Sequence, residues 1–308
     1  MAKYLFLGAS GFIGKAVIQE LARDHQIRAF CRHSVAELEE MENVEFALGD
    51  FTKAESFDEI LDGVDAVIHF ISTTVPSDDT SGIPDEIEQN IIPTVRLLES
   101  MVRCNVKRII FASSAGTVYG ETGKNLNSED SPLKPICAHG LQKVVIENYI
   151  QFYGRRYGLD YSIIRIANPY GWGQKDSKPQ GIIPIFINKN LNNEGISVFG
   201  DGTNMRDYIF IKDLAKGICR VIEYKGPEQI FNLGYGKAYS INEVVELIEK
   251  KMGKKFSEVN YLPKRLCDVK ESYVDYARFH KLLDWRPQID IDKGLHLTIE
   301  RLSQKKNG

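Results

Sequence analysis

The chain has 308 residues, of which 43% are hydrophobic and 26% are charged, and its formal net charge at pH 7 is −3. This balance is ordinary for a globular protein with a sizeable core, and it excludes the strongly basic surface of a nucleic-acid-binding protein. At this length we expect two domains, or one large α/β domain with a smaller lobe attached.

Short apolar runs alternate with helical patterns in the first half of the chain. Pro84 suits a first helical turn, and Pro93 should kink the helix in which it lies. Because parallel strands need crossover connections, the alternation predicts an α/β fold with a doubly wound parallel sheet. The expected strands are 4–7, 27–31, 44–47, 66–70, 108–112 and 161–166, and the expected helices are 14–23, 54–61, 84–105 and 140–157.

The pattern changes after about residue 170. Glycine, proline and asparagine become frequent, the regular alternation stops, and one clear amphipathic helix is expected at 241–252. We therefore divide the chain into a doubly wound domain at 1–170 and a smaller α/β lobe at 171–308, from which some segments return to the first domain.

The cysteines and the apolar stretches exclude further classes of protein. The five cysteines are widely spaced and form no Cys-x-x-Cys pair, so we expect no disulfide framework and no metal site. No apolar stretch approaches the roughly 18 residues of a membrane span. The N-terminus leads into an apolar strand without the layout of a signal peptide. We therefore expect a cytoplasmic protein with neither a membrane nor a nucleic acid as partner.

A glycine-rich turn follows the first predicted strand and opens the first predicted helix. Gly8, Gly11 and Gly14 enclose Phe12 and Ile13 in this turn. Glycines permit a tight turn and let backbone N–H groups approach a pyrophosphate at the helix N-terminus, where the helix dipole favours anions. Strand, glycines and helix come in the required order, so the pattern predicts a dinucleotide-binding site instead of a plain strand-to-helix turn.

The G-x-x-G-x-x-G spacing resembles that of the short-chain dehydrogenase superfamily, especially its extended branch, the NAD-dependent epimerases and dehydratases. An ordered set of matches is more specific than any one member. The resemblance implies a Rossmann domain, NAD or NADP as cofactor and a nucleotide-sugar substrate. Further matching segments are 49–51, 67–70, 111–114, 117–120, 168–171, 200–202, 206–208 and 285–287.

The resemblance also implies which residues surround the cofactor. Besides the glycine turn, Asp50 and Phe51 match the segment that contacts the adenine. Phe70 and Ser72 match the strand end that lines the cofactor groove, and Asn90 matches an asparagine near the cofactor and the catalytic lysine.

One position departs from the pattern of NAD-binding proteins. An acidic residue about 20 positions after the glycines usually binds the ribose diol of NAD. This chain has Cys31, Arg32, His33 and Ser34 there. Arg32 can pair with the 2′-phosphate of NADP, or it can face solvent while NAD binds through other contacts. The sequence leaves NAD and NADP open.

The catalytic helix departs from the family at a second position. Family members use a serine or threonine, a tyrosine, and a lysine four residues after the tyrosine. Lys143 holds the lysine position, but His139 replaces the tyrosine. Imidazole, with a pKa of about 6.5, is mostly neutral at pH 7, so His139 can accept a proton, and Lys143 should lower its pKa further. The alternative is a structural histidine in a chain that has lost or relocated its base.

A hydroxyl group should contact the reacting oxygen. We expect it from Ser114, with Thr117 as the alternative, because the loop after Ser114 is one residue longer than in the commonest epimerase pattern. Tyr119 is the nearest phenol in the sequence and a further candidate base.

Positions in the second lobe match the nucleotide-sugar site of the family. The resemblance implies that Asn168 contacts the diphosphate or the sugar and that Phe199 stacks on the uracil ring. Arg206 and Arg265 would bind the diphosphate, to which guanidinium groups offer paired donors, and Asp268 would bind the ribose.

These matches favour a UDP-sugar 4-epimerase of nucleotide-sugar and polysaccharide metabolism, which works by transient C4 oxidation. Dehydration needs an Asp–Glu pair after the catalytic serine, and Ala115 and Gly116 stand there instead. Two alternatives stay open: a 4-keto-sugar reductase, and a degenerate protein that only binds nucleotide sugar or NAD(P). The resemblance further implies a homodimer formed through the helices at 84–105 and 140–157.

Overall fold

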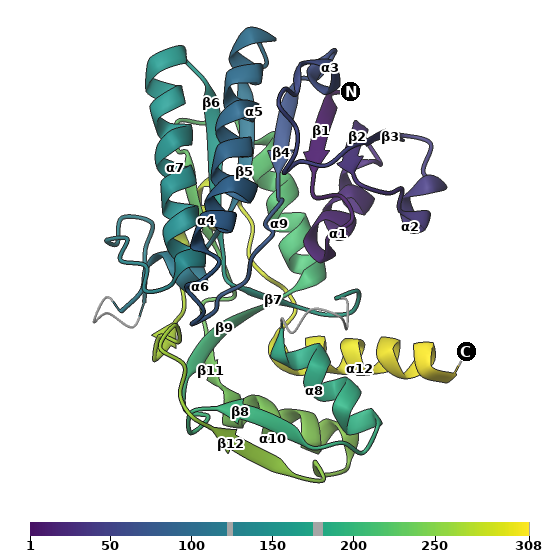
Figure 1. The fold of residues 1–308 in the computed structure, drawn as a ribbon. Coiled ribbons are helices and arrows are strands. Elements are labelled where there is room, and N and C mark those ends of the chain that lie inside the picture. The colour runs from purple at the N-terminus through teal and green to yellow at the C-terminus, as the bar shows by residue number, and fades with distance from the viewer. Residues whose placement is uncertain (122–125, 175–180, 308) are drawn as a thin grey trace. The chain divides into compact units, whose positions relative to one another are not determined.

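The computed structural model describes residues 1–121, 126–174 and 181–307. The chain forms two compact units, each built from several segments (Figure 1). The sequence instead placed one main boundary at residue 170, with some segments returning. The first unit comprises Met1–Ser114, Cys137–Arg165 and Ile218–Phe231, and the second comprises Ala115–Ile136, Ile166–Gly217 and Asn232–Gly308.

A seven-stranded sheet in the order β10-β6-β5-β4-β1-β2-β3 organises the first unit. The pairs β1–β2, β1–β4, β2–β3 and β4–β5 are parallel, which confirms the predicted doubly wound α/β fold. The strand order reverses between β1 and β4, and such a switch point is where these folds bind ligands. The strands are β1 (Lys3–Leu7), β2 (Gln26–Cys31), β3 (Val44–Leu48), β4 (Ala66–His69), β5 (Arg108–Ser114), β6 (Asp160–Ile166) and β10 (Ile230–Leu233).

The helices of the first unit differ from the prediction in two places. The helix expected at 54–61 is a single turn, and the helix expected at 84–105 is divided by a π-helical turn, η1 (Ile87–Ile91). Pro93 therefore lies in the first turn of α5, directly after the π-helical turn, so the helix is interrupted next to the proline that was expected to kink it. The helices are α1 (Phe12–Leu21), α2 (Ala36–Glu39), α3 (Asp58–Leu61), α4 (Ile83–Glu86), α5 (Ile92–Arg103) and α7 (Ala138–Tyr157).

The core of the first unit fixes the position of α7. Figure 1 shows α5 and α7 side by side next to β5. From α7, Ile146, Ile150 and Tyr153 enter the core at helical spacing, where they meet residues of β5 such as Ile109 and Phe111. Full burial of such a side chain stabilises the fold by about 1.5–3 kcal/mol. This packing anchors the preceding turns of α7, which carry the candidate catalytic residues.

The second unit holds a small sheet in the order β11-β9-β13, with β7 also paired to β9, and a two-stranded ribbon of β8 and β12. The predicted helix at 241–252 is confirmed as α10 (Ile241–Met252). It begins at Ile241 because Ser240 and Glu243 form a capping box there. The other elements are α6 (Ala115–Val118), β7 (Asn168–Tyr170), α8 (Ile182–Leu191), β8 (Ile196–Phe199), β9 (Met205–Phe210), α9 (Ile211–Glu223, shared with the first unit), β11 (Ala238–Ser240), β12 (Val259–Leu262), β13 (Glu271–Ser272), α11 (Ala277–Leu283) and α12 (Ile291–Asn307).

Over the described residues, no helix combines the length and apolar character needed to span a membrane. In the same residues, no three His, Cys, Asp or Glu side chains are grouped so that they could hold a metal ion.

Candidate active site

The glycine turn between β1 and α1 is packed too closely for side chains. Gly8 has a φ of +98°, and a Cβ there would lie 3.0 Å from the backbone carbon of Phe70. A Cβ on Gly14 would lie 2.2 Å from the carbonyl oxygen of Gly8. No side chain caps the N-terminus of α1, whose N-cap is Gly11. An uncapped helix end behind a bare backbone turn fits the pyrophosphate of a dinucleotide.

The ends of β2 and β3 carry the residues expected near the adenosine. Arg32 is exposed after β2, and Asp50 is half-buried after β3. Hydrogen bonds from the hydroxyl and the N–H of Thr52 hold the pKa of Asp50 below its usual range, and the positive charge of Arg32 adds to this effect. The structure thus brings Arg32 and Asp50 near each other, and places no acidic residue in the segment directly after β2.

Phe51 lies deeper than its expected contact with adenine suggests. Its side chain is buried in the core, with its ring centroid 5.4 Å from that of Phe57 and 5.0 Å from that of His69. Its cofactor contact stays a prediction.

The segment after β4 carries the other expected cofactor residues. The ring of Phe70 packs on Phe6, and the hydroxyl of Ser72 donates to the carbonyl oxygen of Thr74 at 3.3 Å. Asn90, which is buried, accepts from the N–H of Thr73 at 2.9 Å and donates to its hydroxyl at 2.6 Å. Asn90 therefore fixes this segment and, with it, the position of Thr74.

Lys143 lies on α7 beside the end of β5. Its Nζ donates to the carbonyl oxygen of Ala112 at 3.0 Å and lies 4.9 Å from the ring centroid of Phe111. Ala112 precedes Ser114, the half-buried last residue of β5, by two positions. The structure thus brings the predicted lysine next to the strand that carries the predicted serine.

The buried position changes the protonation of Lys143, which is 5% exposed. Burial lowers the pKa of its amine to about 8, and the Glu147 carboxylate opposes part of that shift. Glu147 itself forms two hydrogen bonds with the guanidinium of Arg165, at 3.2 and 2.8 Å, and accepts a hydrogen bond from Ser113. The sequence interpretation missed these three residues. The spacing of four residues from Lys143 could have found Glu147.

His139 is also buried, with 7% of its surface exposed. Its Nδ1 lies 3.2 Å from the hydroxyl oxygen of Thr74, which also accepts a hydrogen bond from Nε2 of Gln142 at 3.1 Å. Burial lowers the pKa of His139 to about 3, and Lys143 adds to the shift. Lys143 lowers the pKa of His139 as expected, and burial, which the sequence did not indicate, lowers it more. No sequence pattern indicated Thr74 or Gln142.

In the second unit, four of the predicted substrate residues lie together. Asp268 accepts two hydrogen bonds from the guanidinium of Arg265, at 2.9 and 3.0 Å, and one from Arg206 at 3.4 Å. The guanidinium carbon of Arg265 lies 4.7 Å from the ring centroid of Phe199, which is 39% exposed. We call these residues (Phe199, Arg206, Arg265 and Asp268) the arginine cluster.

The remaining two predicted substrate residues lie near α6. A Cβ on Gly116 would lie 3.7 Å from the side-chain oxygen of Asn168, so this asparagine lies beside the residue that precedes Thr117. The side-chain nitrogen of Asn168 donates to the carbonyl oxygen of Asp207 at 3.0 Å. Thr117 is buried.

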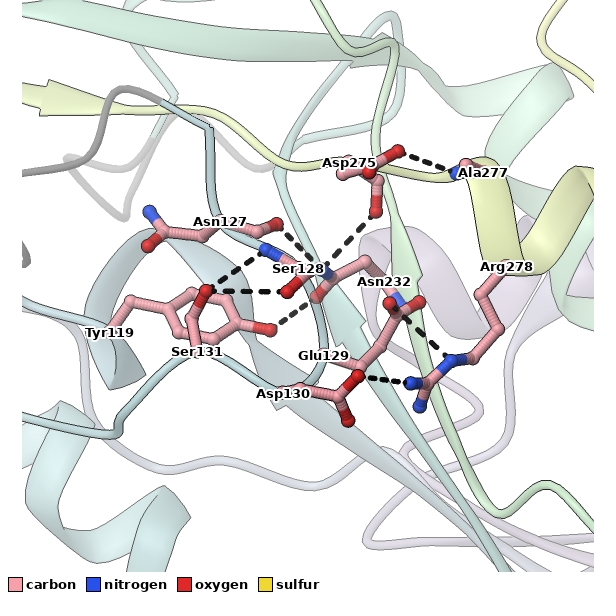
Figure 2. A network of polar contacts seen from close by, with 10 residues as sticks. All are labelled: Tyr119, Asn127, Ser128, Glu129, Asp130, Ser131, Asn232, Asp275, Ala277 and Arg278. Atoms are coloured by element: carbon pink, nitrogen blue, oxygen red, sulfur yellow. Dashed lines mark hydrogen bonds and ion pairs between the residues drawn. The ribbon is translucent and has the colours of Figure 1, made fainter.

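Tyr119 belongs to a structural network. Its phenol, 1% exposed, donates to the side-chain oxygen of Asn232 at 2.6 Å (Figure 2). The N–H of Asn232 donates to the Glu129 carboxylate at 2.9 Å, and Arg278 lies 3.7 Å from the same carboxylate. A phenol enclosed and bonded in this way braces the second unit, so Tyr119 is a poor candidate for the missing base.

The profile of the NAD dependent epimerase/dehydratase family matches residues 4–234 of the chain. The chain belongs to this family. The match covers the glycine turn, β5 and α7, and therefore includes His139 and Lys143. The family assignment made from the sequence is confirmed.

Individual members of the family that resemble the chain differ in activity. A dTDP-4-dehydro-6-deoxyglucose reductase of Escherichia coli is 33% identical over 310 residues, which cover 98% of each protein. The UDP-glucose 4-epimerase of Thermotoga maritima, solved with UDP-glucose, matches with a TM-score of 0.91 and 29% identity over 99% of both chains. The UDP-glucose 4-epimerase of Thermus thermophilus, solved with NAD, matches with a TM-score of 0.88 and 25% identity over 98% of this chain and 99% of that one.

Proposed function

We propose that this member of the family is a UDP-sugar 4-epimerase. The observation that carries the proposal is the buried amine of Lys143, held against β5 two residues before Ser114. Support comes from the arginine cluster, which suits a nucleoside diphosphate, and from the likeness to a 4-epimerase solved with UDP-glucose. When bound, NAD would accept a hydride from C4 of the sugar and return it to the opposite face.

The first unit would hold the cofactor. The tight packing at Gly8 and Gly14 and the uncapped start of α1 support pyrophosphate binding there. The residues that we propose to bind the cofactor are Gly8, Gly11, Phe12, Ile13, Gly14, Arg32, Asp50, Phe51, Phe70, Ser72, Asn90 and Lys143. The family and its NAD-bound members support NAD.

The proton of the C4 hydroxyl needs an acceptor while C4 is oxidised. We assign the hydrogen bond to the C4 oxygen to Ser114, and the proton to the neutral amine of Lys143, whose pKa of about 8 is near working pH. His139, in the position of the family tyrosine, would contact the same oxygen. Returning the proton from Lys143 completes the cycle.

The second unit would bind the nucleotide through the arginine cluster. Two guanidinium groups face one carboxylate there, so the cluster carries net positive charge that suits a diphosphate. Phe199 presents an exposed ring on which uracil can stack, and Asp268 can accept a hydrogen bond from the ribose. Asn168, with Thr117 nearby, would contact the diphosphate or the sugar.

A second candidate function is the reduction of a nucleotide-linked 4-keto sugar. Arg32 favours it, because this arginine is exposed directly after β2 and its guanidinium suits the 2′-phosphate of NADP. The relative in Escherichia coli, a reductase, adds support. Both functions move a hydride at C4, but only the reductase consumes reduced cofactor.

One assay separates these functions. The enzyme, at a concentration far below that of the sugar, is incubated with UDP-glucose, UDP-galactose or other UDP-sugars and NAD, without a reductant, and C4 epimers are measured by NMR. The 4-epimerase gives many turnovers. NADPH-dependent loss of a 4-keto sugar with no epimerisation identifies the reductase. In that case Arg32→Ala should weaken the binding of NADP far more than the binding of NAD. Binding without either activity identifies a degenerate protein.

We also propose that the protein is a homodimer. Leu141, Tyr149 and Phe152 recur at helical spacing on α7 and are exposed, as are Ile87 and Ile92 near the start of α5. Exposed apolar surface of this extent on two adjacent helices is typical of an interface. Analytical ultracentrifugation should show a dimer that Phe152→Glu converts to a monomer. A monomeric native chain would contradict this proposal.

A further inference from the structure

We propose that Thr74 and Gln142 are positioning residues, which hold His139 as the tautomer that carries its proton on Nε2. His139 would then donate a hydrogen bond to the C4 oxygen of the sugar instead of accepting a proton from it. The inference rests on the proposed function for the substrate, but the tautomer is a property of the protein alone.

The hydroxyl of Thr74 decides the tautomer because it has a single hydrogen. Its oxygen accepts a hydrogen bond from Nε2 of Gln142 at 3.1 Å. Within the described part of the chain, the acceptor in reach of the hydroxyl hydrogen is Nδ1 of His139, at 3.2 Å. Nδ1 can accept only if it is unprotonated, and in a neutral ring the proton is then on Nε2.

With the Gln142 amide oriented as in the structure, where its buried Oε1 has no hydrogen-bond partner among the described residues, the opposite arrangement leaves one more group without a partner. If Nδ1 of His139 donated to Thr74, the threonine oxygen would accept two hydrogen bonds and its own hydrogen would have no acceptor among the described residues. An unsatisfied polar group in this partly buried place destabilises the arrangement. Rotating the Gln142 amide by 180° would reverse every donor in this chain of bonds, so the orientation of one amide sets the role of His139.

The geometry also explains what a neutral imidazole can do there. With Nδ1 engaged by Thr74, Nε2 is the ring nitrogen left for a ligand, and no bond to it is present within the described residues. An N–H fixed in this direction stabilises the negative charge that develops on the C4 oxygen as its proton leaves. The proton itself goes to Lys143, so no proton is gained or lost by His139.

The tautomer can be measured directly by NMR of the protein labelled with ¹⁵N-histidine, at pH 7.5. We expect the proton on Nε2 of His139, with Nδ1 unprotonated and accepting a hydrogen bond; the His139→Gln spectrum assigns the signals. His69 provides an internal reference. Thr94 donates its hydroxyl to the carbonyl oxygen of Asn90, so it must accept from Nε2 of His69 at 3.0 Å. A proton on Nδ1 of His139 would overturn the inference.

A matched pair of variants at Thr74 tests the role of the tautomer in turnover. Thr74→Val removes the hydroxyl and Thr74→Ser keeps it. We expect Thr74→Val to shift the Nδ1 signal of His139 and to lower kcat roughly tenfold with KM nearly unchanged, which is less than the loss for removing a whole donor. Thr74→Ser should preserve the signal and most of kcat. Identical Nδ1 signals in the native protein and Thr74→Val would overturn the inference.

His139→Gln retains an N–H donor without the imidazole, whereas His139→Leu retains neither. If His139 acts as a hydrogen-bond donor, we expect turnover to be at least about tenfold higher in His139→Gln than in His139→Leu. Equal loss in both variants, with native tautomer and cofactor binding intact, would overturn the donor role. Absence of turnover in the native enzyme with every UDP-sugar would instead refute the proposed function, and the NMR result would be unaffected.

Discussion

Two clusters of charged residues in this chain differ in how deeply they are buried. In the first unit, Glu147 and Arg165 are fully buried and Lys143 nearly so. In the arginine cluster of the second unit, the Arg265 side chain is 38% exposed. Burial shifts the protonation of Lys143, whereas partial exposure leaves the guanidinium groups accessible to a ligand. If the proposed roles hold, depth below the surface, more than residue type, separates the group that transfers a proton from the groups that bind the diphosphate.

Removal of the buried amine should have the largest effect. Lys143→Met should lower kcat by about 1000-fold, because general acid–base catalysis of this kind contributes about 100- to 10,000-fold. Steady-state kinetics with UDP-galactose measures the loss. Lys107→Met, at an exposed position before β5, is the control and should leave kcat unchanged. Retention of more than a tenth of native activity in Lys143→Met would show that the two clusters do not differ as proposed.

The buried ion pair should dominate stability in the first unit. Arg165→Met leaves Glu147 buried without its hydrogen-bonded guanidinium, and urea unfolding should show a loss of about 3–5 kcal/mol. The double variant Glu147→Leu/Arg165→Met should recover a large part of this loss, because the Glu147 carboxylate is no longer buried without the guanidinium. Glu37→Gln, which breaks a pair with Lys15 near the surface, should change little. Equal effects of the buried and the surface substitutions would contradict the comparison.

The arginine cluster should govern affinity instead. Arg206→Ala and Arg265→Ala should each weaken the binding of UDP or a UDP-sugar by about 1–3 kcal/mol in calorimetry, because each removes charge-assisted hydrogen bonds to phosphate. Arg278→Ala removes an arginine of the same unit that pairs with Asp130, and it should leave the affinity unchanged. If neither cluster variant weakens binding, the nucleotide site is elsewhere.

The smallest expected effect is a loss of stability at acidic pH that arises from the buried histidines. Burial lowers the pKa of His69 to about 3, and the charge of Lys143 adds to this. A histidine with a lowered pKa contributes full stability above its unfolded pKa of about 6.5, and that stability is lost as the pH falls toward 3. Lowering the pH from 7.5 to 5.5 should therefore cost about 1 kcal/mol through His69.

His69→Gln should reduce this dependence of urea unfolding on pH, and His296→Gln, at an exposed position, should not. The same dependence in all three proteins would show that His69 is not held neutral by burial.

Local patterns predicted those parts of the structure that depend on neighbours in sequence. The glycine turn and the amphipathic helix α10 follow from local spacing, and the choice of Lys143 and His139 follows from the resemblance to the family. The π-helical turn before Pro93 did not, because it depends on how that segment is packed. Thr74 and Arg165 could not be predicted either: each comes from a different strand end, and only the folded chain brings them to α7. The depth of His139 also depends on tertiary packing, so the sequence could predict the effect of Lys143 on its pKa but not the larger effect of burial.

The dependence of kcat/KM on pH for a UDP-sugar tests the central claim most directly. If the proton goes to Lys143, activity should rise with pH as the amine becomes neutral, with an apparent pKa near 8. The charged and titratable groups that face this amine are Glu147, His69 and His139, and the two histidines stay neutral throughout. We therefore expect no inflection near 6.5. A single rise centred near 6.5 that disappears in His139→Gln would contradict it, and would make the imidazole the base.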